Sequence, residues 1–502
     1  MITGNYIGPD NPDYSEKFHE ACGVFGIYSN EDDIDVVRLT YFGLYALQHR
    51  GQQSCGIAVS QNGHITGHKG LGLVSEVFTE KILDRLEGKI AVGHTRYSTT
   101  GGASVEDCQP LIVRYKDGQL AIAHNGNLIN ASKIRLDFEN RGAIFQTSSD
   151  SEIIANLISC FGLQYQNFEQ VLIETTKTIE GSYAVVIMTG NKLVGIRDPW
   201  GLRPLCIGKM GNSYILTSES CALNAIGAEF VRDVEPGEIV IIEEGTLRSI
   251  RTDQDKPHSL CIFEHIYFAR PDSFIDGASI YQSRLEAGKL LAVQHPVEAD
   301  LVAGVPDSGI TAAIGFSRQS GIPYGEVLIK NRYVGRTFIQ PTQRIREQSV
   351  NIKLNTLKFE VEGKRIVIID DSIVRGTTTK KIVRMLKEAG AKEVHVRISS
   401  PPVKFPCYFG IDIATKEYLI AANNSIEEIR EIIGADSIGF LSVENLLKCP
   451  IGAPKDSFCT ACLTGRYPMK VPAEMDETLE NNNLQKTIER YGLNGNLQRS
   501  RG

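Results

Sequence analysis

The chain has 502 residues, which at about 150 residues per domain corresponds to two or three domains. Its 42% hydrophobic and 23% charged residues are ordinary for a soluble globular protein and exclude intrinsic disorder and a collagen-like structure. The net charge of −7 gives no reason to expect a nucleic-acid partner, and no apolar run approaches the roughly 18 residues of a membrane span.

Residues 1–21 differ in character from the chain that follows them. They contain two prolines, four acidic residues and one lysine, and they lack the basic start and the apolar middle of a secretory signal. Two interpretations are open, a flexible N-terminal extension or a propeptide whose removal exposes Cys22. Composition alone favours the extension.

Strand-like segments separated by turns fill the chain from Cys22 to residue 245. The clearest are 55–60, 90–93, 120–124, 183–188 and 239–243. The polar stretch 244–259 is a candidate linker, and it suggests a first domain over 22–255 and a second over 256–474.

In the second domain the pattern changes to alternating strands and helices, which predicts a parallel α/β sheet. The expected elements are strands at 300–305, 366–369 and 393–398 and a helix at 378–389. The remaining residues, 475–502, form a polar C-terminal tail, for which we expect a helix with a frayed end.

Residues 364–390 are the most informative segment of the second domain. Asp370 and Asp371 directly follow a short apolar run that is typical of a strand buried on both faces. A Gly/Thr turn then enters a helix, and a helix N-terminus at the carboxyl end of a parallel strand suits a phosphate. Neighbouring carboxylates suit sugar hydroxyls or Mg²⁺. The alternative, a merely solvated strand end, is disfavoured by this combination.

The stretch VIIDDSIVRGTTT, residues 367–379, resembles the loop of type I phosphoribosyltransferases that binds 5-phosphoribosyl 1-pyrophosphate (PRPP). The resemblance implies that the 5′-phosphate is bound by Arg375, Gly376, Thr377, Thr378 and Thr379. It implies that Asp370 and Asp371 face the ribose and one Mg²⁺ ion per chain. The segment AGVPDSG, residues 303–309, resembles the pyrophosphate loop of that family, which implies that Asp307 and Ser308 lie near the leaving group and that Ser308 is a further Mg²⁺ ligand.

Residues 330–350 contain five basic residues and one acidic residue. They are either a solvated surface loop or, as the resemblance implies, a mobile lid in which Lys330 contacts PRPP. Closure of a lid excludes water, which would otherwise capture an oxocarbenium-like ribosyl centre.

Several short motifs follow one another in the first domain: CGVFG from Cys22, LQHRGQ at 47–52, GHTRYST at 93–99 and HNGNL at 124–128. SDSE at 149–152 then opens a helix with the spacing of a capping box. Each is weak alone, because a cysteine is commonly a core residue and Asn-Gly a common turn. Together they resemble class II glutamine amidotransferases, which implies an N-terminal-nucleophile αββα fold.

This second resemblance implies a glutaminase site. Cys22 would attack the glutamine amide, with its own α-amino group as general base, because that amine has a pKa of about 7.7–8.0. This requires cleavage after Ala21, so the propeptide interpretation now replaces the extension. The Asn125 side chain and the Gly126 N–H would form the oxyanion hole. For glutamine binding, the resemblance implies Arg96 at the α-carboxylate, Asp150 at the α-amino group and Arg50 in shaping the pocket.

The eleven cysteines are an odd number spread widely, which favours a reduced, cytoplasmic protein over a disulfide framework. Cys459 and Cys462 form a CxxC motif that is compatible with zinc, an iron–sulfur centre or redox chemistry. The resemblance to family members with a cleaved leader implies a 4Fe–4S cluster, one per chain, with Cys261, Cys407, Cys459 and Cys462 as its ligands. Cys449 is a further cysteine close to the CxxC motif in the sequence, and it is an alternative candidate for a ligand.

The order of the two halves resembles the family of glutamine-dependent PRPP amidotransferases, which open purine nucleotide synthesis. The resemblance implies that glutamine, PRPP and water give 5-phosphoribosylamine, glutamate and pyrophosphate, with ammonia passing inside the protein. It also implies purine nucleotides as feedback inhibitors and a homotetramer, without membrane or nucleic-acid partners. Two alternatives stay open, a PRPP-sensing regulatory protein and a glutaminase uncoupled from ribosyl transfer.

Overall fold

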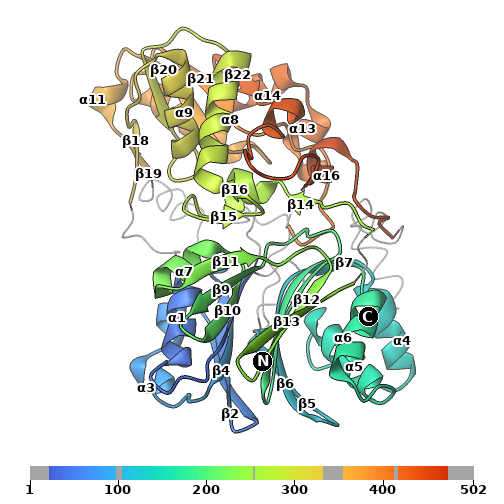
Figure 1. Ribbon diagram of the computed structural model, residues 1–502. Coiled ribbons are helices and arrows are strands. Elements are labelled where there is room, and N and C mark those ends of the chain that lie inside the picture. Colours follow the sequence, from blue (N-terminus) through green and yellow to red (C-terminus); the bar gives the residue numbers. More distant parts are fainter. Residues whose placement is uncertain (1–21, 98–103, 253–254, 332–353, 412–415, 473–502) are drawn as a thin grey trace, which may run out of the picture.

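The computed structural model describes residues 22–97, 104–252, 255–331, 354–411 and 416–472. In Figure 1 they form two parts, a lower one built on two sheets and an upper one built on a parallel sheet. The predicted propeptide, the predicted tail and all of the predicted lid except Lys330 and Asn331 lie outside the described residues.

The first sheet of the lower part has seven antiparallel strands in the order β11-β9-β10-β1-β4-β2-β3. The strands are β1 (Gly23–Tyr28), β2 (Ser54–Gln61), β3 (His64–Leu71), β4 (Ile90–Arg96), β9 (Cys206–Met210), β10 (Ser213–Thr217) and β11 (Glu229–Asp233). Helices α1 (Val36–Ala46) and α7 (Ser220–Ile226) cover its outer face, where Phe25, Leu44 and Leu223 share one core. The short helices α2 (Val74–Val77) and α3 (Glu80–Leu83) flank them.

The second sheet has six antiparallel strands in the order β13-β12-β8-β7-β6-β5. They are β5 (Leu111–Tyr115), β6 (Gly118–Leu128), β7 (Gly181–Thr189), β8 (Lys192–Arg197), β12 (Glu238–Glu243) and β13 (Thr246–Arg251). Helices α5 (Ser151–Gly162) and α6 (Phe168–Thr178) cover its outer face, with α4 (Ala131–Asn140) beside them. Val92 and Val186 belong to the core between the sheets, which confirms the predicted αββα layers.

The strands predicted between residues 22 and 245 are present, but the predicted linker is partly wrong. Thr246–Arg251 form β13, which pairs with β12 at the edge of the second sheet. Four of its six residues are exposed, so its sequence is mostly polar and gives little strand signal.

The upper part contains a parallel sheet, as predicted, with four strands in the order β17-β20-β21-β22. The fourth strand, β22, was not predicted. Its strands are β17 (Leu301–Gly304), β20 (Arg365–Asp370), β21 (Glu393–Ile398) and β22 (Ser437–Phe440). Helices α8 (Ile280–Gln294) and α9 (Ile310–Ser320) pack on one face, and α12 (Thr377–Glu388) and α14 (Ile426–Ile433) on the other. Both faces are therefore covered, which explains the continuous apolar runs of the strands.

The remaining elements of the upper part are short. They are β14 (Leu260–Cys261), the helical turn η1 (Glu264–Phe268), β15 (Phe274–Ile275), β16 (Ala278–Ser279), β18 (Leu328–Lys330), β19 (Leu354–Thr356), α11 (Lys358–Val361), η2 (Lys416–Tyr418), α13 (Ile420–Asn423), α15 (Val443–Leu446), β23 (Phe458–Cys459) and α16 (Ala461–Thr464).

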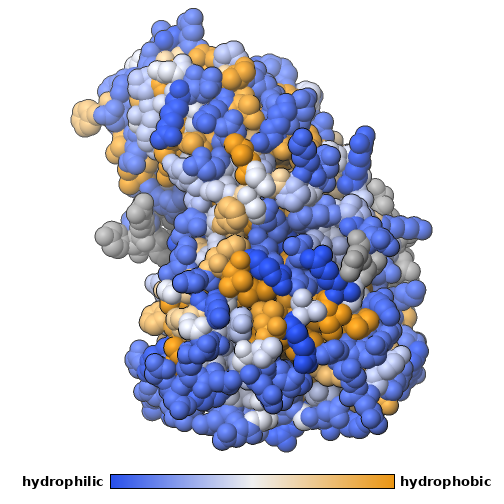
Figure 2. All heavy atoms as spheres, viewed as in Figure 1, coloured by the Kyte–Doolittle hydropathy of each residue, from blue (hydrophilic) through white to orange (hydrophobic). Residues whose placement is uncertain are grey.

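The surface is mostly hydrophilic on the face shown in Figure 2, with hydrophobic side chains gathered just below the junction of the two parts. β11 and β15, which lie there in Figure 1, carry the exposed residues Phe230, Val231 and Phe274. No helix in the described part of the chain is long and apolar enough to cross a membrane.

Candidate active sites

Cys22 lies directly before β1, whose first residue, Gly23, pairs with Thr95 of β4. Its Sγ lies 3.6 Å from the carbonyl oxygen of Tyr97. Burial raises the pKa of the Cys22 thiol, although the nearby Arg96 and Arg203 guanidinium groups oppose the rise. The thiol is therefore protonated at neutral pH and needs a base before it can attack a carbonyl carbon. His94 does not suit that role, because burial lowers its pKa to about 3.

Asn125 and Gly126 are neighbours in β6, where they pair with Ala184 and Tyr183 of β7. The Asn125 side chain is 1% exposed, and within the described residues neither its Oδ1 nor its Nδ2 has a hydrogen-bond partner. An unsatisfied buried amide is costly, so this one is suited to a ligand that arrives with an acceptor. Gly126 has a φ of +148°, and a Cβ there would lie 2.0 Å from the Ser182 carbonyl oxygen, so only glycine fits.

Asp150 is the N-cap residue of α5, and it accepts a hydrogen bond of 3.0 Å from the Leu128 N–H. Its carboxylate lies 3.5 Å from Nδ1 of His124 and acts electrostatically on the Cys22 thiol. Burial tends to raise the pKa of Asp150, but His124 and the backbone donors outweigh it and lower the pKa. An ionised carboxylate at this point suits an ammonium group.

The predicted capping box at residues 149–152 is wrong. The N-cap is Asp150, and its side chain makes no cap hydrogen bond. The Glu152 carboxylate instead accepts from the backbone N–H groups of Gln146 and Thr147. Three N–H or O–H donors of the preceding loop reach this carboxylate, so it fixes that loop instead of the helix N-terminus.

The two predicted arginines lie in different settings. Arg96 ends β4, is 6% exposed and acts electrostatically on Cys22, which is a position suited to a substrate carboxylate. Arg50 is completely buried, and its nitrogens contact the Cys22 carbonyl oxygen, Glu219 and Glu264. Arg50 therefore acts on the pocket through Cys22 and not as a free cation.

Sequence reasoning missed the acidic partners of Arg50 and also Arg203. Glu219 and Glu264 lie 169 and 214 residues from Arg50 in the sequence, so no local spacing indicates the contacts. One signal was available: Glu264 interrupts the apolar run CIFEHIYF, and a charged residue in such a run is usually buried with a partner.

The predicted PRPP residues come together at the carboxyl edge of the parallel sheet. β17 and β20 are neighbours in register, so the turn with Asp307 and Ser308 lies beside Asp370 and Asp371. The turn after β17 packs closely against the end of β20, since a Cβ on Gly309 would lie 2.2 Å from the Ile369 carbonyl oxygen. Such an edge is where open α/β sheets bind ligands.

Asp370 and Asp371 are both buried, at 2% and 1% exposure. Asp371 accepts a hydrogen bond of 2.6 Å from the Ser372 hydroxyl. Arg284 of α8 also acts electrostatically on Asp371, and burial lowers the pKa of this arginine to about 10. Carboxylate and hydroxyl oxygens are the ligands that Mg²⁺ prefers.

Gly376 is the N-cap of α12 with a φ of +85°, and Thr377, Thr378 and Thr379 form the first turn of the helix. First-turn N–H groups have no partner within a helix and, with the helix dipole, favour a phosphate. The Arg375 guanidinium stacks 4.9 Å from the ring of Tyr418. Lys330 ends β18, and its Nζ donates a hydrogen bond of 2.6 Å to Asp307.

The four predicted cluster ligands gather at the junction of the two parts. Cys261 and Cys459 are opposite each other in the β14–β23 pair, and the Phe409 N–H donates to Cys407 Sγ at 3.4 Å. The other three thiols all act electrostatically on Cys462, and burial raises the pKa of all four. Cys449 is not among them, because its Sγ contacts the Asn445 carbonyl oxygen.

Among the described residues, no three histidine, cysteine or acidic side chains converge as the ligands of a single metal ion. This includes the four cysteines. A 4Fe–4S cluster makes a different demand, because each thiolate binds a separate iron.

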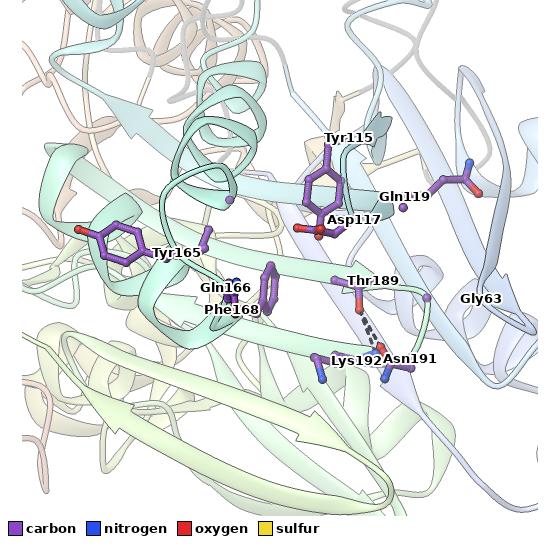
Figure 3. Close-up of a pocket in the computed structure, with 14 residues that line it drawn as sticks. Gly63, Tyr115, Asp117, Gln119, Tyr165, Gln166, Phe168, Thr189, Asn191 and Lys192 are labelled. Carbon is purple, nitrogen blue, oxygen red and sulfur yellow. Dashed lines mark hydrogen bonds between the residues drawn. The ribbon is translucent and has the colours of Figure 1, made fainter.

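The pocket in Figure 3, of about 380 Å³, contains none of the predicted site residues. It is lined by Tyr115, Phe168 and Lys192 among others. Gly118 and Gln119, which also line it, begin β6, whereas Asn125 and Gly126 lie near the other end of that strand. The pocket is therefore separate from the Cys22 site.

Comparison with known proteins agrees with the two domains. Residues 94–225 match the glutamine amidotransferase domain and residues 282–399 the phosphoribosyl transferase domain. An amidophosphoribosyltransferase of Archaeoglobus fulgidus is 51% identical over 454 residues, which cover 90% of this chain and 99% of that protein. The chain belongs to the amidophosphoribosyltransferase family. The amidophosphoribosyltransferase of Bacillus subtilis is also 51% identical, over 90% of this chain and 95% of that protein.

Solved structures support the same family. The glutamine PRPP amidotransferase of B. subtilis, complexed with ADP and GMP, is 50% identical and covers 90% of this chain and 98% of its own, with a TM-score of 0.85. A structure described as the allosteric regulatory enzyme of purine biosynthesis matches with the same identity and TM-score. The chain is therefore a transferase of purine biosynthesis with two catalytic domains, which favours the coupled enzyme over the regulatory protein and the uncoupled glutaminase.

Proposed function

We propose that the residues described above perform the two half-reactions of the amidophosphoribosyltransferase family: ammonia is released from glutamine at Cys22 and displaces pyrophosphate from PRPP at the edge of the parallel sheet. The observation that carries the assignment of the first site is the buried, unsatisfied amide of Asn125. It lies on the same strand as Leu128, whose N–H binds Asp150, the carboxylate that acts on the Cys22 thiol. Such an amide is a donor in place before charge develops on a substrate oxygen.

At the glutaminase site, the α-amino group of Cys22, freed by cleavage after Ala21, takes the thiol proton. The thiolate attacks the amide carbon of glutamine, and the oxyanion accepts hydrogen bonds from Asn125 Nδ2 and the Gly126 N–H. The α-amino group gives the proton to the leaving nitrogen, and collapse of the tetrahedral intermediate releases ammonia. Water then hydrolyses the thioester to glutamate and the free Cys22 thiol. Arg96 and Asp150 bind the α-carboxylate and α-amino groups, since each has the opposite charge.

At the second site, Arg375 to Thr379 bind the 5′-phosphate of PRPP, and Asp370 and Asp371 bind the ribose hydroxyls. Asp307, Ser308 and Lys330 lie at the pyrophosphate. Ammonia attacks C1 of the ribose as the bond to pyrophosphate breaks. The oxygen donors of Ser308, Asp370 and Asp371 fit Mg²⁺, which would neutralise the charge of the leaving pyrophosphate.

The four junction cysteines fit a 4Fe–4S cluster. They are all thiols, they interact electrostatically with one another, and a backbone N–H donates to Cys407 Sγ, as is typical around cluster sulfurs. A cluster there would join three segments of the second domain beside the first domain. They are the loop before Phe409, residues 459–462 and Cys261. Its role in this proposal is structural.

Three further proposals concern the partners and setting of the chain. Purine nucleotides act as its feedback inhibitors, a proposal supported by the ADP and GMP of the B. subtilis structure. The chain assembles as a homotetramer. It works in the cytoplasm, which agrees with eleven cysteines that are all unpaired.

The function is tested by replacing the nucleophile. The wild-type chain is expected to release glutamate and pyrophosphate in equal amounts, and only when both glutamine and PRPP are present. C22A is expected to lose glutamine-dependent pyrophosphate release completely and to keep ammonia-dependent release within about twofold of wild type, since the second site is separate.

Pyrophosphate release by C22A with glutamine, or loss of the ammonia-dependent reaction in C22A, would contradict the proposal. Glutamate formation indifferent to PRPP would identify an uncoupled glutaminase.

A further inference from the structure

A cluster of buried charged side chains joins the two domains next to Cys22. Arg50, Arg203 and Glu219 come from the first domain and Glu264 from the second, and each is at most 1% exposed. Arg50 donates two hydrogen bonds to the Glu264 carboxylate, at 2.9 and 2.8 Å, and one to Glu219. Arg203 Nη1 lies 3.6 Å from the same Glu264 carboxylate.

Glu264 is anchored in the core of the second domain. It begins the helical turn η1, and its neighbours Phe263 and Ile266 share a core cluster with Phe316 of α9 and Val367 of β20. Its carboxylate nevertheless contacts two arginines of the first domain. The position of this carboxylate is therefore set by the second domain.

The contact continues from Arg50 to the nucleophile. Burial alone would lower the pKa of Arg50, but Glu264 and Glu219 outweigh it and raise the pKa, so the guanidinium stays charged. Two of its nitrogens bind the two carboxylates, and its Nε donates a hydrogen bond of 3.2 Å to the Cys22 carbonyl oxygen. The orientation of that carbonyl fixes the Cα of Cys22, which carries both the thiol and the proposed general base.

The same cluster reaches the cysteine loop of the second domain. Arg203 Nη2 donates a hydrogen bond of 2.6 Å to the Phe409 carbonyl oxygen, and the Ser182 hydroxyl donates to the same oxygen. Glu264 therefore lies between two arginines, one bound to Cys22 and the other to the loop that carries Cys407.

We propose that Glu264 is a positioning residue for the glutaminase reaction, supplied by the second domain: it holds Arg50, and Arg50 holds the main chain of Cys22. The inference rests on the proposed function of Cys22. A misplacement of about 1 Å at a reacting group can cost on the order of 100-fold in rate. The glutaminase site is therefore incomplete without the second domain.

The test compares two variants that each weaken one buried ion pair across the domain junction. E264Q removes the charge that holds Arg50. D276N removes the charge that pairs with Arg197, at 2.6 Å, and no contact joins Asp276 to Cys22 in the described structure. Steady-state rates are measured on the full-length enzyme with glutamine and, separately, with ammonia.

We expect E264Q to lower kcat with glutamine by about 10- to 100-fold, with the KM for glutamine and the ammonia-dependent rate within about twofold of wild type. D276N is expected to leave the ratio of the two rates unchanged. Equal changes of this ratio in both variants, or an unchanged ratio in E264Q, would overturn the inference.

If E264Q does not fold, the double variant R50M/E264M removes both charges together and leaves no unpaired charge from this pair. It is expected to show the same selective loss of glutamine-dependent kcat, and an unchanged ratio would overturn the inference. C22A separates this inference from the proposed function: if C22A abolishes the glutamine reaction while E264Q leaves it intact, only the role of Glu264 fails.

Discussion

At Asn125, burial and hydrogen bonding oppose each other, because the side chain is enclosed and its amide has no partner among the described residues. The family resemblance predicted this residue and the structure supplies the physical reason for it. The contacts of Arg50 and Arg203 were not predicted, because they join residues far apart in the sequence through side chains that carry no motif.

N125A tests the proposed role of the Asn125 amide as an oxyanion donor. Loss of one oxyanion donor is expected to lower the glutamine-dependent kcat by about 10²- to 10³-fold with little change in KM, because the contact forms in the transition state. Ammonia-dependent activity should be unchanged. N127A is the matched control, since Asn127 lies two residues along β6 and its amide already binds the Tyr408 carbonyl oxygen. A similar kcat loss in N127A would contradict the role of Asn125.

At the scale of elements, the strands and the helix at 378–389 were predictable because hydrophobic periodicity and turn residues are local signals. The segment from β20 to α12 is the best example, where an apolar strand, two acids and a Gly/Thr turn appear in order. The edge strand β13 was not predictable, because it forms by pairing with β12. The start of α5 was not predictable either, because Glu152 binds the loop at Gln146 and Thr147.

G376A tests the loop between β20 and α12. Gly376 has a φ of +85°, and a Cβ there would lie 2.8 Å from Ile420 Cδ1, so alanine strains the turn. We expect the KM for PRPP to rise about tenfold with either nitrogen donor, while the KM for glutamine is unchanged.

G434A is the control for G376A. Gly434 follows the last residue of α14 with a φ of +74°, and an added Cβ there would have no atom within 4 Å. Alanine at this position therefore strains the backbone in a similar way but does not disturb the loop between β20 and α12. An equal rise of the KM for PRPP in G434A would show that general destabilisation, and not phosphate binding, explains the effect.

At the scale of the molecule, the two-domain order was predictable because each half carries its own motifs. The junction was not, since it is built from contacts such as Arg50–Glu264 and Arg197–Asp276 that join the two domains. The gathering of four cysteines at this junction explains how residues from 261 to 462 can form one site. Each of these two ion pairs includes at least one residue outside the motifs that predicted each half.

Activation of the Cys22 thiol by a free α-amine on the same residue is tested most directly by the intact mass of the native enzyme. We expect a chain that begins at Cys22 and carries the added mass of one 4Fe–4S cluster, in a preparation fully active with glutamine. Leader removal and cluster content are thus read from one spectrum. A chain that still begins at Met1 and uses glutamine at the full rate would contradict the account.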